Sequence, residues 1–159
     1  MSTARRVLTI TLAVLAAVGF ALAVEGGRWW SLGADVQIGP VGSQHCFGGG
    51  CKPSGLAWMG GSALWDRLGF ATYVGGLLAA LVLVAMAGGL AARRPARLTS
   101  LIAAVATATA TVVGGAFIAL RPTGLAGVAV DRGVVLFVAA VVLAAAAIVS
   151  ARLTPQASA

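Results

Sequence analysis

The most reactive side chains in this sequence belong to two cysteines and to the histidine beside the first of them. Cys46 and Cys51 are the only cysteines, and His45 is the only histidine. Four residues separate the two thiols, and three of those four are glycines. Glycine readily adopts the positive φ that a tight reversal needs. The spacing therefore predicts two strands that close on a turn and a Cys46–Cys51 disulfide between them.

Two other chemistries use the same residue types. A catalytic dithiol is normally C-x-x-C, and membrane thiol oxidoreductases relay electrons to a second pair, which this sequence lacks. A closed zinc site needs four ligands, and adjacent His45 and Cys46 would point in opposite directions on a strand. We therefore predict a non-enzymatic protein without metal or cofactor, and keep a thiol–disulfide oxidoreductase as an alternative.

The composition indicates where these residues must sit. Of 159 residues, 60% are hydrophobic and only 9% are charged, and the mean hydropathy is +1.00. A soluble domain carries roughly 25% charged residues, so this chain could not cover its apolar surface in water. It is also too apolar for a disordered chain. A polytopic membrane protein remains.

The charged residues leave four uncharged apolar runs. A helix needs about 20 residues to cross the hydrocarbon core, and each run is close to that length. We predict an all-α membrane protein, a single four-helix antiparallel bundle. Its expected spans are residues 7–24, 68–92, 98–120 and 133–151. The expected connections are a long loop at 25–67, short loops at 93–97 and 121–132, and a tail at 152–159.

The arginines predict the orientation. With the N-terminus in the cytoplasm, six basic residues and no acidic ones lie on the cytoplasmic side. The positive-inside rule favours this arrangement, with both termini cytoplasmic in a plasma membrane. The loop 25–67 then lies on the oxidising, extracytoplasmic side, where disulfides persist. The basic pI needs no nucleic-acid partner, because topology signals and anionic lipids explain it.

The first apolar run has a second interpretation. Basic residues precede it, and Ala21-Leu22-Ala23 has the form that signal peptidase cleaves. The run is longer than a usual signal-peptide core, so we favour a retained helix.

The third span predicts how the helices pack. Small residues let helix backbones approach closely in lipid. Four of them recur at intervals of four: Ala103, Thr107, Thr111 and Gly115. No ionisable residue lies inside any span, which argues against a pump, a carrier or a voltage sensor.

The long loop holds most of the remaining information. Residues 35–38 alternate polar and apolar, as a half-buried strand does, and turn residues follow. Tryptophans flank the loop and indicate either an interfacial belt or an anchor that packs the loop on the bundle. We expect exposed apolar residues of this loop to bind a protein partner or a second copy: Trp30, Val36, Ile38, Phe47 and Trp58. The alternative is an accessory subunit of a larger transporter or respiratory complex, which would bind through the third span.

The layout resembles the claudin and peripheral myelin protein superfamily. Those proteins have four helices, an internal N-terminus, and a first extracellular loop whose small sheet carries a tryptophan and a disulfide. The resemblance matches Trp30 to the family tryptophan and Cys46 and Cys51 to the two cysteines. Val41-Gly42-Ser43 stands where the family has Gly-Leu-Trp. The Ala-, Val-, Gly- and Arg-rich composition is typical of a bacterium with a GC-rich genome.

Overall fold

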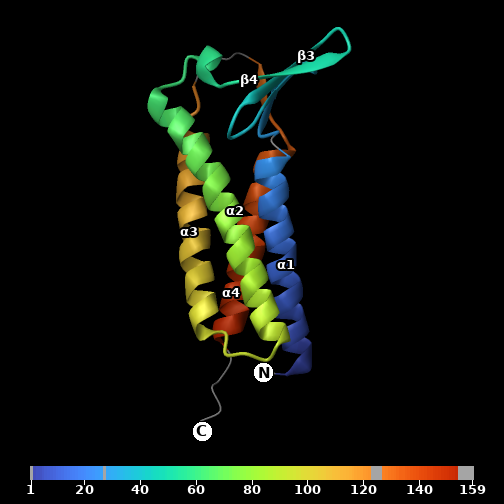
Figure 1. Cartoon of the computed structure of the whole chain (residues 1–159), viewed down its shortest axis with the longest axis vertical. Coiled ribbons are helices and arrows are strands. Elements are labelled where there is room, and N and C mark those ends of the chain that lie inside the picture. Colours follow the sequence, from blue (N-terminus) through green and yellow to red (C-terminus); the bar gives the residue numbers. More distant parts are fainter. Residues whose placement is uncertain (1, 27, 123–126, 154–159) are drawn as a thin grey trace.

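The computed structural model describes residues 2–26, 28–122 and 127–153. Four helices run antiparallel along the long axis, and a small sheet covers one end of them (Figure 1). All four are long and apolar enough to cross a membrane. They are α1 (Thr3–Glu25), α2 (Ala63–Ala91), α3 (Arg97–Ala119) and α4 (Arg132–Arg152). The expected four-helix arrangement is therefore present.

Helix α2 begins five residues before the expected span. Ser62 caps its N-terminus, because the Ser62 hydroxyl accepts a hydrogen bond from the backbone N–H of Trp65 at 3.3 Å. Its 29 residues extend roughly 44 Å at 1.5 Å per residue, which exceeds the hydrocarbon core. Asp66 and Arg67 thus lie on the helix but in its first turns, beyond the apolar stretch.

Small residues bring the helices together, with α1 packed between α2 and α4. A Cβ built on Gly19 of α1 would lie 3.0 Å from the Ala140 Cβ of α4, and one on Gly75 of α2 would lie 3.5 Å from the Ala110 Cα of α3. Gly88 and Gly89, which looked similar in the sequence, have no neighbour within 4 Å of a built Cβ. Of these glycines of α2, the one that lies against a neighbouring helix is therefore in the part nearer the sheet.

The stripe expected on α3 is only half correct. Ala103 and Thr107 are buried, but Thr111 and Gly115 are exposed. A spacing of four advances about 40° around a helix at each step, so a strict i+4 series leaves the packed face. The buried face instead continues through Ala110, Gly114 and Phe117.

The helix end opposite the sheet carries direct contacts between α1 and α4. The Thr9 and Ser150 hydroxyls lie 2.9 Å apart, and an Arg5 guanidinium nitrogen donates to the Leu153 carbonyl at 3.4 Å. The α2–α3 connection lies at this same end (Figure 1). The six basic residues grouped in the sequence therefore share one end of the bundle.

The sheet has five antiparallel strands in the order β4-β3-β2-β1-β5. They are β1 (Trp30–Leu32), β2 (Val36–Ile38), β3 (Ser43–Phe47), β4 (Gly50–Ser54) and β5 (Val128–Val130). A 3₁₀ turn, η1 (Ala57–Met59), leads from β4 toward α2. The expected paired strands are present, but β5 comes from the second loop and pairs with β1, with Trp30 opposite Val130. The first loop is therefore not a separate folded element.

Candidate interaction site

A cluster of buried aromatic rings fixes the sheet on the bundle. Trp29, Trp30 and Trp65 pack around Phe117 of α3, with ring centroids 4.8–5.7 Å from the Phe117 ring. Each of two indole N–H groups has a buried partner: Trp29 donates to the Ala23 carbonyl at 2.7 Å, and Trp65 donates to the Phe117 carbonyl at 3.0 Å. Buried indoles need such partners. These tryptophans anchor the sheet to the bundle, as one of the two interpretations of the tryptophans in the sequence predicted.

Backbone hydrogen bonds join the same segment to α4. The Gly133 N–H donates to the Arg28 carbonyl at 2.6 Å, and the Asp131 N–H donates to the Trp29 carbonyl at 2.9 Å. A Cβ on Gly133 would lie 2.5 Å from Trp29 Cδ1, so only glycine allows this approach. The start of β1 and the start of α4 are therefore one packed unit.

Three residues expected on the contact surface are buried. Trp30 is 1% exposed, Val36 is 7% exposed and Ile38 is fully buried. In the strand register they lie on one face of the sheet, and that face packs on the helix ends. Alternation located the apolar face correctly, but the bundle covers it. These residues position the sheet, and the two expected contact residues that remain exposed are Phe47 of β3 and Trp58 of η1.

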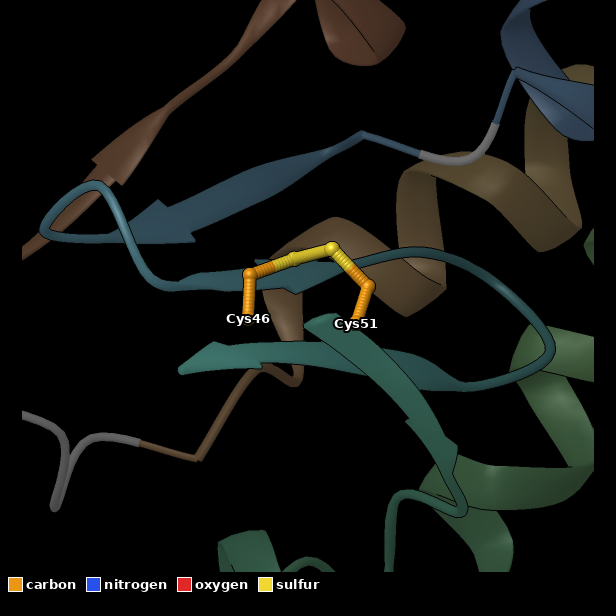
Figure 2. Close-up of a disulfide and its surroundings, with 2 residues drawn as sticks. All are labelled: Cys46 and Cys51. Atoms are coloured by element: carbon orange, nitrogen blue, oxygen red, sulfur yellow. A yellow bond between two sulfur atoms is a disulfide. The ribbon is translucent and has the colours of Figure 1, made fainter. Parts of the chain in front are cut away.

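The hairpin β3–β4 extends beyond the helices, and the disulfide crosses it (Figure 1, Figure 2). Cys46 and Cys51 occupy directly opposite positions, with Cα atoms 4.0 Å apart, and their sulfurs are bonded. Gly48 and Gly49 in the turn both have positive φ, at 60° and 83°. The disulfide expected from the spacing is confirmed. It limits the motion of a hairpin whose second strand is exposed along its whole length.

Aromatic side chains gather on one face of this hairpin. Phe47 is 64% exposed and Trp58 of η1 is 40% exposed. His45 lies between them, with ring centroids 4.9 Å from Trp58 and 6.4 Å from Phe47. We call His45, Phe47 and Trp58 the hairpin surface.

Ser43 contacts two residues of the hairpin surface and holds their rings in place. Its hydroxyl accepts the Trp58 indole N–H at 2.8 Å and lies 3.2 Å from His45 Nε2. Ser43 is buried, so this shared partner fixes both rings relative to β3. In the sequence Ser43 showed only as a turn residue, and nothing in the local pattern marked it as the partner of Trp58.

The β4 edge of the sheet is poorly suited to strand addition. The Cys46 N–H donates to the Asp35 carbonyl, on the β2 side, so Cys46 and Cys51 form a non-hydrogen-bonded pair across β3–β4. Pro53, two residues along β4 from Cys51, has the same outward orientation. Because proline has no backbone N–H, it offers no donor at this edge. Cys51 then supplies the single outward amide N–H of β4. Proline and lysine on an edge strand discourage edge-to-edge pairing, and Lys52 lies beside Pro53. We therefore expect contacts at this edge to use side chains more than backbone pairing.

Comparisons with known proteins add no information to the geometry of this site. No protein-family model matches the chain, and no curated protein matches it at a significant level.

Proposed function

We propose that this protein is a non-enzymatic multi-pass membrane protein that associates with another protein, or with a second copy of itself, through the hairpin surface. One observation carries the proposal. The apolar face that anchors the sheet continues past the bundle and ends in two exposed aromatic rings, Phe47 and Trp58. Aromatic residues dominate the energetic centres of protein interfaces.

Order in the hairpin supports the same proposal. Binding loses less free energy when the contacting side chains are already fixed. The Cys46–Cys51 disulfide restrains the strands, and Ser43 restrains Trp58 and His45. The surface is therefore organised before any partner arrives.

The membrane side and the family are part of the proposal. The six arginines at the end opposite the sheet favour a cytoplasmic position for that end in a plasma membrane. A sheet that carries Trp30 and the Cys46–Cys51 disulfide above four helices supports a relationship to the claudin and peripheral myelin protein superfamily. The accessory-subunit alternative would use the exposed Thr111 and Gly115 of α3.

Site-specific photocrosslinking in native membranes tests the contact. A benzophenone amino acid replaces Phe47 in one variant and Val130 in the control. Val130 is a matched control because it is equally apolar, 61% exposed, and lies on the opposite edge strand of the same sheet. We expect an adduct from position 47 only. An adduct of twice the chain mass indicates self-association, and any other mass indicates a partner protein. Equal adducts from both positions, or an adduct from position 130 alone, would contradict the proposal.

A further inference from the structure

A cavity of about 410 Å³ lies between the end of α1, the start of α4 and the sheet. Its walls are the last turn of α1, the first residue of α4, strands β2 to β4 and the turn between β2 and β3. Gln37, Gln44 and Pro53 line it from the sheet, on the opposite strand face from His45 and Phe47. A volume of this size is within the range of sites that bind small molecules or headgroups.

The charges in the wall come from three residues. Arg28 and Arg132 line the cavity together with Glu25. Within the described ranges 2–26, 28–122 and 127–153, neither arginine has a carboxylate oxygen within 4.0 Å of its guanidinium nitrogens. Asp131 is next to Arg132, but its carboxylate caps α4 by accepting the Arg132 backbone N–H.

The fold holds these two arginines together. The Arg28 carbonyl accepts the N–H of Gly133, the residue after Arg132, at 2.6 Å. The absence of a side chain at Gly133 permits this contact, because a Cβ would meet the Arg28 carbonyl oxygen at 2.6 Å. Both arginines therefore line one cavity, and an anion bound there would be attracted by two positive charges.

The cavity also lies at a defined depth. Val24 and Glu25 end α1, and Arg132 begins α4, so the cavity opens where the apolar parts of both helices stop. The polar headgroup region of a bilayer begins at this level, so lipid phosphates lie at the depth of the cavity. Guanidinium groups match phosphate oxygens in charge and in planar, bidentate geometry.

We propose that this cavity binds a phosphate group at the membrane surface, with Arg28 and Arg132 as its ligands. The amide side chains of Gln37 and Gln44 supply further hydrogen-bond donors from the sheet. The Tyr73 hydroxyl donates to Glu25 Oε1 at 2.5 Å, which holds the one carboxylate of the wall toward α2. The phosphate is that of a phospholipid headgroup or of a soluble phosphate, and the two sources are separable by experiment.

Native mass spectrometry of the detergent-purified full chain, titrated with phosphatidylglycerol or phosphatidylethanolamine, tests the lipid source. The test variant is Arg28→Gln/Arg132→Gln. The matched control, Arg67→Gln/Arg121→Gln, removes two positive charges near the start of α2 and just after the end of α3, outside the cavity wall. We expect lipid affinity to fall at least about tenfold in the test variant and to stay unchanged in the control.

A second arm uses inorganic phosphate, followed by ³¹P line broadening on the same three proteins. Broadening that depends on Arg28 and Arg132, without lipid retention, supports a soluble phosphate as the source. Equal losses in both double variants indicate general electrostatic attraction and overturn the proposal. So does a wild-type chain that retains neither ligand. Arg28→Lys/Arg132→Lys checks folding and geometry: it keeps both charges and restores part of the affinity, and thermal unfolding of each variant confirms that the bundle is intact.

Discussion

The two halves of the sheet differ in what holds them. Strands β1 and β2 lie over the helix ends, and Trp30, Val36 and Ile38 join the hydrophobic core of the bundle. Strand β5 pairs with β1 and adds the partly buried Val128. Strands β3 and β4 extend beyond the helices, and the disulfide, Ser43 and the strand pairing supply their order. The inner half is stabilised by burial, and the outer half by local restraints.

This difference separates the residues that position the sheet on the bundle from the exposed residues that we propose contact a partner. Burying Trp30, Val36 and Ile38 makes the sheet a fixed extension of the bundle. The same strand face continues outward along β3, and Phe47 at the end of this strand is exposed. The two halves should therefore respond differently to substitution.

The largest effect is expected from Trp29→Ala. The change removes a fully buried ring that contacts Phe117 and Phe137, and it leaves the Ala23 carbonyl without its indole donor. We expect a loss of about 3–5 kcal/mol in the free energy of unfolding. Thermal unfolding in detergent, followed by near-UV circular dichroism, measures it. Trp58→Ala is the control from the outer half and should cost far less; similar losses in both variants would remove the distinction between the halves.

A smaller effect is expected from Gly114→Ala, beneath the aromatic cluster. A Cβ at this position overlaps the Phe137 ring, which Trp29 and Phe20 hold in place. Overpacking of this kind costs about 1–3 kcal/mol. The adjacent Gly115→Ala adds the same methyl group where nothing lies within 4 Å, and should change stability by less than about 0.5 kcal/mol. If the same unfolding assay gives equal values for both variants, the packing between α3 and α4 differs from that described.

The smallest effect on the bundle is expected from Cys46→Ser/Cys51→Ser. Closing so short a loop stabilises the hairpin by about 2 kcal/mol in the chain-entropy model. We expect faster hydrogen exchange at the β3–β4 amides and an unchanged unfolding temperature of the helices. Exchange and unfolding are measured on the same preparation, with oxidised wild type as reference. Accelerated exchange in β1 and β5 as well would show that the halves are coupled.

The sequence predicted the features that depend on local pattern. Four uncharged apolar runs were enough to predict the four helices. Two cysteines around a glycine turn were enough to predict the hairpin and its disulfide. Helix α2 begins five residues before the expected span, because Asp66 and Arg67 bound the apolar stretch but do not end a helix that Ser62 caps.

Long-range contacts could not be predicted from local sequence patterns. Strands β1 and β5 have three residues each, too few to show alternation, and they pair across about 100 residues of chain. The burial of Trp30 depends on Trp65 and Phe117, which come from α2 and α3. The cavity also combines arginines from both loops, and neither Arg28 nor Arg132 stands out in its own segment.

The contacts at the two ends of α1 and α4 have a mechanical consequence. At one end Thr9 meets Ser150, midway Gly19 meets Ala140, and at the sheet end Arg28 and Trp29 are bonded to the first turn of α4. The first and last helices are therefore in contact at both ends and midway. A tilt of one helix relative to the other would have to break contacts on the side of the sheet and on the side of the basic residues together.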